Sequence, residues 1–288
     1  VAVAVAGPKG RRATSGCVER LSSAIMKAAL AAVAAATVAI AAILLRARRR
    51  RLRAKKIAYI NTEDAPKWHD QLEVFAAALR LPPEVFEKFD AFAGQFPAAA
   101  ALQRGEYSGV LLTGSHFSAV DPTLPWLDGL FASIRAAAAA PDVRVLGCCF
   151  GAQAVAVALG GAVGANPDGR FCYGVEEIAL DGPRAARLLP EALPPTLRLL
   201  ESHGEQVTRL PPTAELLGSS AGTPHEIFVA GEHLNVLCVQ AHPEFTPELM
   251  GARIAPALRD KGRLSAAELE ERAAGMRQRP LDSERVCS

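Results

Sequence analysis

The sequence predicts an α/β protein with a mostly parallel sheet, helices on both faces of the sheet and a few added antiparallel strands. From residue 56 onward, short apolar runs alternate with longer amphipathic segments, which is typical of parallel strands joined by helices. After Gly174 the apolar runs are separated by turns that contain proline and glycine, which indicates antiparallel or mixed pairing. Half of the 288 residues are apolar and 22% are charged. This composition suits a globular domain and excludes a disordered or fibrous chain.

The first half of the predicted domain alternates strands and helices. Strands are expected over residues 57–60, 86–92, 109–113 and 143–148. Helices are expected over residues 66–81, 124–140 and 151–159. In the first helix, Leu72, Phe75 and Leu79 form one apolar stripe with helical spacing. The last helix is followed by the pair Gly160-Gly161, which is typical of a helix end.

The second half contains mainly short strands. They are expected over residues 175–180, 197–201, 214–219, 227–230 and 236–240. A last helix is expected over residues 246–261, and the final dozen polar residues are expected to fray. The predicted organisation is a basic, alanine-rich tail (1–55), one domain (56–262) and a polar extension (263–288).

The net charge of +2 hides two oppositely charged parts. Residues 1–56 hold 13 of the 32 Lys and Arg and one of the 30 acids, so this part carries +12 and the remainder −10. An acidic domain with few aromatic residues argues against a groove that follows nucleic-acid phosphates. We therefore expect no nucleic-acid partner.

The tail contains a segment that is almost long enough to span a membrane. Residues 28–45 include a single polar residue, Thr37, and eight positive charges follow within residues 46–56. Three interpretations stay open: a membrane anchor whose basic flank keeps the domain in the cytoplasm, an organellar targeting peptide, or a doubtful gene start with Met26 as the initiator.

The six cysteines show no metal-binding spacing. They contain no C-x-x-C pair and no paired Cys/His pattern, so neither a structural zinc site nor another metal or cofactor is expected. A domain of this size can bury its own core without disulfides. Reduced thiols and a cytoplasmic catalytic domain are the default expectation.

The segment Gly147-Cys148-Cys149-Phe150-Gly151 joins a predicted strand to a predicted helix. This G-x-C-x-G spacing is the cysteine form of a nucleophile elbow, in which flanking glycines allow a strained turn to raise the central side chain. The helix N-terminus favours the thiolate form of Cys149 and leaves the Phe150 N–H free to bind an oxyanion. Cys149 is the predicted nucleophile, although a buried core cysteine is the alternative. Cys148 is expected to fill the core.

His242 is the predicted base. It follows the strand 236–240, so it lies at the sheet edge where open α/β sheets bind ligands. Glu244, two residues later, can hold the imidazole tautomer. The alternative is a solvated surface turn. Among the other histidines, His116 is the one that could line a pocket.

The motifs G-C-C-F-G-A-Q at 147–153 and A-H-P-E at 241–244 make the chain similar to class I glutamine amidotransferases, and closest to stand-alone plant γ-glutamyl peptidases. The resemblance covers residues 56–262. Two further segments agree in order: 107–115 with the loop that supplies an oxyanion donor, and 202–207 with the substrate-side H-Q-D-E-V segment. The resemblance implies a flavodoxin-like sheet and a Cys-His-Glu triad of Cys149, His242 and Glu244. It also implies an oxyanion hole at Gly114 and Phe150 and a substrate pocket at Gln153, His203 and Ser115.

The chain departs from the family pattern at three places. Ala152 replaces a usual histidine, Ala241 replaces a usual glycine, and His203-Gly204-Glu205-Gln206-Val207 replaces H-Q-D-E-V. The 27 residues after Lys261 are too few for a synthetase domain. The resemblance therefore implies direct hydrolysis of a small γ-glutamyl substrate such as glutathione, a glutathione conjugate or glutamine, through a γ-glutamyl thioester. Two alternatives stay open: a glutaminase subunit that delivers ammonia to a separate synthetase, and a catalytically silent, tethered binding module.

Overall fold

The structure is a computed structural model that describes residues 56–189 and 193–287. The chain divides into two units, residues 1–54 and 55–288, and the description below concerns the second. The predicted apolar segment 28–45 lies outside the described residues. Within the described residues, no helix is both long and apolar enough to cross a bilayer.

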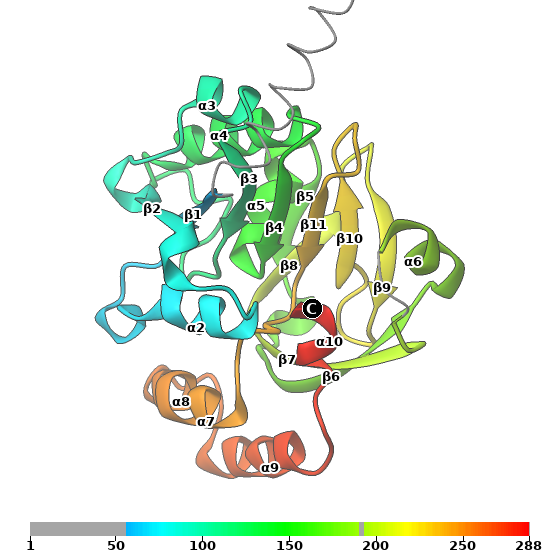
Figure 1. The fold of residues 1–288 in the computed structure, drawn as a ribbon. Helices are drawn as coiled ribbons and strands as arrows, with labels where there is room; N and C mark the ends of the chain where they lie inside the picture. The colour runs from blue at the N-terminus through cyan, green and yellow to red at the C-terminus, as the bar shows by residue number, and fades with distance from the viewer. Residues whose placement is uncertain (1–55, 190–192, 288) are drawn as a thin grey trace, which may run out of the picture. The chain divides into compact units, whose positions relative to one another are not determined.

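A nine-stranded mixed sheet organises the domain in the order β2-β1-β3-β4-β11-β10-β9-β6-β7 (Figure 1). The strands are β1 (Lys56–Asn61), β2 (Phe86–Asp90), β3 (Tyr107–Leu112), β4 (Arg144–Cys148), β6 (Cys172–Leu180), β7 (Thr196–His203), β9 (Glu215–Ser219), β10 (Ile227–Ala230) and β11 (Val236–Val239). Neighbours from β2 to β11 pair in parallel, and the remaining pairs are antiparallel. The predicted fold class is therefore confirmed. A separate two-stranded antiparallel sheet joins β5 (Ala162–Ala165) to β8 (Glu205–Arg209).

Helices cover both faces of the main sheet because its strands are apolar on both sides. The helices are α2 (Gln71–Ala78), α3 (Ala99–Gln103), α4 (Leu127–Ala138), α5 (Phe150–Ala158), α6 (Gly182–Leu188), α7 (Pro247–Leu249), α8 (Ala255–Asp260), α9 (Ala266–Arg277) and α10 (Ser283–Cys287). Successive strand residues point to opposite faces. In β1, Ala58 and Ile60 belong to the core formed with α3, α4 and α5, whereas Tyr59 packs with Phe75 of α2. This two-sided burial explains the nearly continuous apolar runs of the parallel strands.

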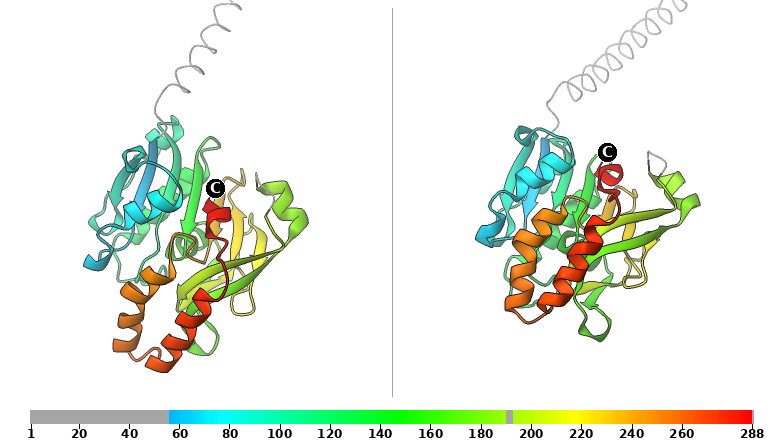
Figure 2. Two further views of the ribbon diagram at one scale, coloured as in Figure 1. Left: turned by 60° about the horizontal axis from the view of Figure 1, so that its bottom comes forward. Right: turned by 90° about the horizontal axis from the view of Figure 1, so that it is seen from below.

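A third layer of helices lies beside the carboxyl ends of β4 and β11. Helix α7, a π-helical segment (Met250–Ile254) and α8 follow one another, and α8 and α9 lie next to each other in both views of Figure 2. Their apolar side chains form a cluster with Trp68 and Phe245. This cluster makes one wall of the site described below.

Some boundaries differ from the sequence-based expectations. The helix expected over 66–81 is a 3₁₀ turn, Pro66–Trp68, followed by α2, because proline sets the first turn apart. The strand expected over 86–92 ends at Asp90, since a 3₁₀ turn closes at Gly94 with φ +73°.

The C-terminal part differs more. The single helix expected over 246–261 contains a π-helical segment, and it is not the last helix. Ser265 and Glu268 form a reciprocal capping box that starts α9. The expected frayed end contains α10, whose Val286 packs against the sheet.

Candidate active site

Cys149 occupies a strained turn between β4 and α5. Its backbone has φ +50° and ψ −107°, a region that residues with a Cβ atom seldom adopt. The turn is held from both sides, because the Cys149 N–H donates to Val239 O (2.8 Å) and its carbonyl accepts from Gln153 N (3.0 Å). The residue is 5% exposed and caps the N-terminus of α5. Backbone strain of this kind, which the neighbouring structure maintains, is typical of a functional position.

The two glycines of the elbow are required by close backbone contacts. A Cβ atom on Gly151 would lie 2.5 Å from the carbonyl oxygen of Leu112, and one on Gly147 would lie 2.9 Å from backbone atoms of Gly151. Strand β4, helix α5 and strand β3 therefore approach one another only because these positions lack side chains. The G-x-C-x-G spacing thus has the local geometry that the sequence predicts.

His242 and Glu244 form a buried pair beside Cys149. His242 Nδ1 lies 2.7 Å from Glu244 Oε1, and the two side chains are 5% and 1% exposed. Burial lowers the pKa of His242, but the charges of Glu244 and Cys149 and hydrogen bonds to both side chains raise it well above its ordinary value. Since Glu244 occupies Nδ1, Nε2 is the ring nitrogen left for the sulfur. The arrangement favours an imidazolium beside the cysteine.

An aromatic stack supports the imidazole. The rings of His242 and Phe245 are parallel with centroids 4.0 Å apart, and Phe245 in turn stacks on Trp68 at 5.2 Å. The guanidinium of Arg253 lies 5.2 Å from the Trp68 ring centroid and makes two hydrogen bonds to Asp70, at 2.6 and 2.7 Å. The stack therefore fixes the plane of the imidazole.

A cavity of about 450 Å³ opens over these groups. This is within the range of ligand-binding pockets, roughly 300–1,000 Å³. Six of the eight residues predicted for the site line it: Gly114, Ser115, Cys149, Gln153, His203 and His242. Phe150 and Glu244 are not part of the lining and lie buried. The structure thus brings the predicted residues to one place.

Comparison with known proteins identifies the family. The model of the family "Glutamine amidotransferase class-I" matches residues 94–257, more than half of the chain. The chain belongs to this family. Gamma-glutamyl peptidase 4 of Arabidopsis thaliana is 31% identical over 180 residues, which cover 62% of this chain and 68% of that protein.

A second protein sequence and a solved structure are also similar to this chain. A GMP synthase [glutamine-hydrolyzing] of Bordetella avium is 35% identical over 149 residues, or 50% of this chain and 26% of that protein. A glutamine amidotransferase structure from Methylobacillus flagellatus superposes with a TM-score of 0.59 at 24% identity, over 82% of this chain and 91% of that chain. The structural likeness concerns the fold alone.

The residues predicted to bind substrate also hold the pocket together. The Gln153 side-chain amide donates to Glu205 O (2.7 Å) and to Gln240 Oε1 (3.2 Å), which ties α5 to β8. The Ser115 hydroxyl donates to Thr62 O at 2.7 Å. Gly114 leaves room for the imidazole, because a Cβ atom there would lie 2.8 Å from His242 Cε1.

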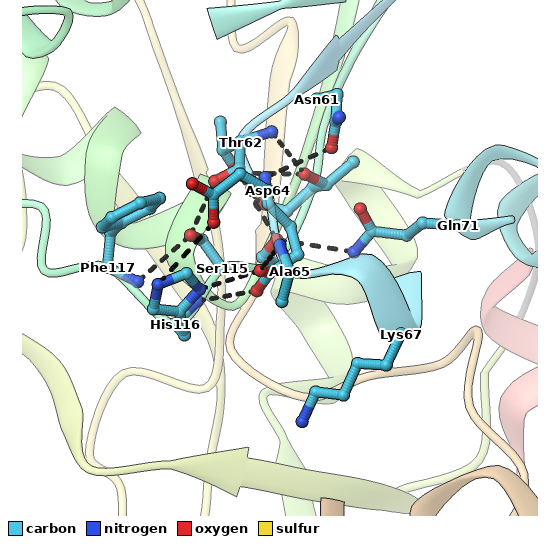
Figure 3. A network of polar contacts seen from close by, with 12 residues as sticks. Asn61, Thr62, Asp64, Ala65, Lys67, Gln71, Ser115, His116 and Phe117 are labelled. Atoms are coloured by element: carbon cyan, nitrogen blue, oxygen red, sulfur yellow. Dashed lines mark hydrogen bonds and ion pairs between the residues drawn. The ribbon is translucent and has the colours of Figure 1, made fainter. Parts of the chain in front are cut away.

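The loops after β1 and β3 carry an acidic network that lines the pocket (Figure 3). The buried carboxylate of Glu63 accepts hydrogen bonds from the His116 N–H (3.0 Å) and from the Ala65 N–H (2.8 Å), and it lies 2.8 Å from His116 Nδ1. Asp64 lies 3.9 Å from His116 Nε2. Together these three side chains offer atoms that could hold a cation, but both oxygens of Glu63 already have partners. As the sequence suggested, His116 lines the pocket.

A pair of fully buried acids lies behind His203. His203 Nδ1 is 2.9 Å from Glu205 O, and its Nε2 is 3.3 Å from Glu201 Oε2. Burial raises the pKa of Glu201 to about 8, and burial together with the charge of Glu201 raises the pKa of Glu226 well above its usual value. Glu226 also accepts a hydrogen bond from Ser220 Oγ at 2.6 Å. One or both carboxyls are therefore protonated at neutral pH.

This pair makes the stability of the protein depend on pH. The pKa of Glu201 is about 8 in the folded protein and near 4.5 in an unfolded chain, so the folded state binds more protons between these values. Its contribution is fully present below pH 4.5 and is lost as the pH rises through 8. We expect Glu201→Gln to reduce the fall in Tm between pH 5 and pH 8, measured by calorimetry. Glu232→Gln, on an exposed turn, is the matched control. An unchanged pH dependence in Glu201→Gln would contradict the assignment.

Sequence reasoning missed three kinds of pocket residue. Phe245 directly follows the His-Pro-Glu motif, so the sequence did contain a signal for its stacking role. Trp68 comes from a distant turn, and no local pattern links it to His242. The lysines and arginine at the rim, discussed below, are also far apart in the chain.

Proposed function

We propose that this amidotransferase hydrolyses γ-glutamyl amide bonds of small molecules through a thioester on Cys149. The observation that carries the proposal is a strained cysteine at a helix N-terminus beside the buried His242–Glu244 pair. The pocket of about 450 Å³ over these groups supports a small-molecule substrate. Similarity to a gamma-glutamyl peptidase supports the same bond type.

The first half of the reaction forms the acyl-enzyme. The Cys149 thiolate attacks the γ-carbonyl carbon, a C–S bond forms and the carbonyl electrons move to oxygen. As this oxyanion collapses, the C–N bond breaks. The His242 imidazolium gives its Nε2 proton to the departing amine, and the γ-glutamyl group stays on sulfur as a thioester.

Water completes the cycle. Neutral His242 takes a proton from a water molecule whose oxygen attacks the thioester, and collapse of the second oxyanion releases glutamate and the thiolate. The Glu244 carboxylate keeps Nδ1 as the donor throughout and stabilises the imidazolium.

Two backbone N–H groups are proposed as the oxyanion hole. Phe150 is the first residue of α5, where N–H groups have no acceptor within the helix. Gly114 follows β3 and lies beside both reacting side chains, since a Cβ atom built on it would lie 3.7 Å from Cys149 Cβ and 2.8 Å from His242 Cε1. Two donors that face a developing oxyanion are a strong source of transition-state stabilisation.

The proposal is tested by incubating the purified chain with glutathione, glutamine and γ-glutamyl dipeptides. We expect released glutamate and, after rapid quenching, a γ-glutamyl adduct on the peptide that contains Cys149, measured by mass spectrometry. Absence of both glutamate and the adduct with every substrate would reject hydrolysis and favour the silent binding module.

A second candidate is a glutaminase subunit that supplies ammonia to a separate synthetase. Similarity to part of a GMP synthase supports it. This function predicts that glutamine turnover rises on binding of a synthetase that copurifies with the chain. A high rate on dipeptides without any partner favours the peptidase function.

We also propose a reducing, cytosolic site of action for the catalytic domain. The five described cysteines are free thiols, including the proposed nucleophile. Free thiols persist in reducing compartments. Anchoring or targeting through residues 28–45 stays a prediction.

A further inference from the structure

Three cationic side chains at the mouth of the pocket suggest what the departing amine carries. Lys67, Lys261 and Arg263 all line the cavity that contains Cys149 and His242. Lys67 belongs to the 3₁₀ turn before α2, whereas the other two follow the end of α8. The three charges thus meet from two distant parts of the chain.

Lys67 and Lys261 are close enough for their charges to interact. Burial lowers the pKa of Lys67, Glu63 opposes this effect, and the charge of Lys261 lowers the pKa further. Lys67 Nζ donates to Arg253 O at 2.8 Å, and no dashed line joins it to the acidic network in Figure 3. The side chains of Lys261 and Arg263 form no ion pair with any residue that the structure describes. Their charge is therefore available to a ligand.

The acids of the same pocket are occupied. Glu63 is held by His116 and the loop N–H groups, and both oxygens of Glu205 accept from Ser118 Oγ, at 3.0 and 2.8 Å. Glu63 lies on the loop that follows β1, and Glu205 is the first residue of β8. Because these acids already have partners, the part of the pocket at the end of α8, with Lys261 and Arg263, keeps its positive charge and forms a cationic side.

The cationic side is the side of the leaving group. His242 gives its proton to the departing amine in the proposed reaction, so that amine lies next to the imidazole. The stack leads from His242 through Phe245 to Trp68, which neighbours Lys67 in sequence. Trp68 and Phe245 also pack with Leu258, three residues before Lys261. If the departing nitrogen carries a substituent and this substituent extends along the apolar wall, it reaches Lys67, Lys261 and Arg263.

We propose that Lys67, Lys261 and Arg263 bind a carboxylate on the departing amine. The preferred substrates are then γ-glutamyl amino acids or peptides with a free C-terminal carboxylate, and glutamine, which releases ammonia, is a poor substrate. This inference rests on the proposed hydrolysis and specifies its substrate class. Charge-assisted hydrogen bonds from lysine and arginine suit a carboxylate at this exposed rim.

The test compares substrate pairs that differ only in the terminal charge. The pairs are γ-glutamylglycine with γ-glutamylglycinamide, and glutathione with its C-terminal amide. For the full chain we expect kcat/KM to be roughly tenfold higher for the acid in at least one pair. In the double variant Lys261→Gln/Arg263→Gln the preference should fall to about onefold to twofold, because the rate on the acid should fall more than the rate on the amide. High salt should reduce the wild-type preference, because exposed charges are screened.

The control and the opposing outcomes separate this inference from the function on which it rests. Arg259→Gln removes one positive charge two residues from Lys261, but Arg259 does not line the pocket and is paired with Asp260. It should keep the preference. Equal losses on acids, amides and glutamine would instead assign the cations to the glutamyl α-carboxylate and overturn the inference. Equal wild-type rates on both members of each pair would also overturn it, although hydrolysis itself would stand. Absence of both released glutamate and a glutamyl-enzyme with every substrate would reject the hydrolase function.

Discussion

Cys149→Ala should abolish the release of glutamate, with kcat falling by roughly 10⁴–10⁶-fold. Alanine lacks the sulfur that forms the thioester, and water bound in its place lacks the covalent route. The substitution removes one atom at a 5% exposed position, so the fold should survive. Steady-state glutamate release and the mass of the quenched enzyme measure the effect: the variant should show no γ-glutamyl adduct.

Cys148→Ala is the matched control for this prediction. Cys148 is the last residue of β4 and is fully buried on the face that holds Tyr59 and Phe75. Burial raises the pKa of its thiol well above the usual value, so it is a poor nucleophile. The variant should keep kcat within about twofold and lose about 1 kcal/mol of stability. Equal loss of turnover in both variants would contradict Cys149 as the nucleophile.

Glu244→Gln should lower kcat by roughly 10³–10⁴-fold while leaving the fold intact. Glutamine cannot supply the negative charge that stabilises the imidazolium of His242. In one orientation its amide NH₂ would face Nδ1 and impose the wrong tautomer. In the other orientation that NH₂ would replace Glu244 Oε2, which is buried without a hydrogen-bond partner. Neither orientation reproduces the native arrangement.

The pH profile distinguishes this role from a structural one. The charge of Glu244 raises the pKa of His242, so its removal should lower that pKa. Activity requires a protonated His242 when the amine departs, and activity is lost as the pH rises through this pKa. The alkaline limb of kcat should therefore move to lower pH in Glu244→Gln. Glu248→Gln, on the exposed side of α7, should leave both kcat and the profile unchanged. A Glu244→Gln profile like that of the unmodified chain would contradict the role.

Much of the fold was predictable because its signals are local. Each parallel strand is a short apolar run, and the elbow is encoded within five residues by glycines at positions 147 and 151. The small sheet of β5 and β8 was missed because β5 has only four residues, mostly small, and β8 contains Glu205 and Arg209 and has no apolar run. The division of the 246–261 helix was missed because the prediction did not use Gly251, which lies inside the π-helical segment, or Pro256, which lies in the first turn of α8.

The proposed reacting groups were predictable for the same reason, and the rest of the pocket was not. Cys149, His242 and Glu244 belong to compact motifs at strand ends. Trp68, Lys67 and Lys261 reach the pocket through tertiary packing of η1 (Pro66–Trp68) against α8, and no sequence pattern at either segment specifies the other. In this sequence, the residues that determine substrate specificity are therefore harder to predict than the residues proposed to carry out the reaction.

The column of His242, Phe245, Trp68 and Arg253 has a consequence for synthesis of the protein. Trp68 leaves the ribosome long before His242, Phe245 and Arg253. The contact between Arg253 and Asp70 joins residues that are 183 positions apart in the chain. The thiol of Cys149 is thus translated well before the ring that would activate it. A nascent chain that stops before β11 has the sulfur of Cys149 but lacks the imidazole of His242, so the proposed reaction has to wait until almost the whole domain has emerged.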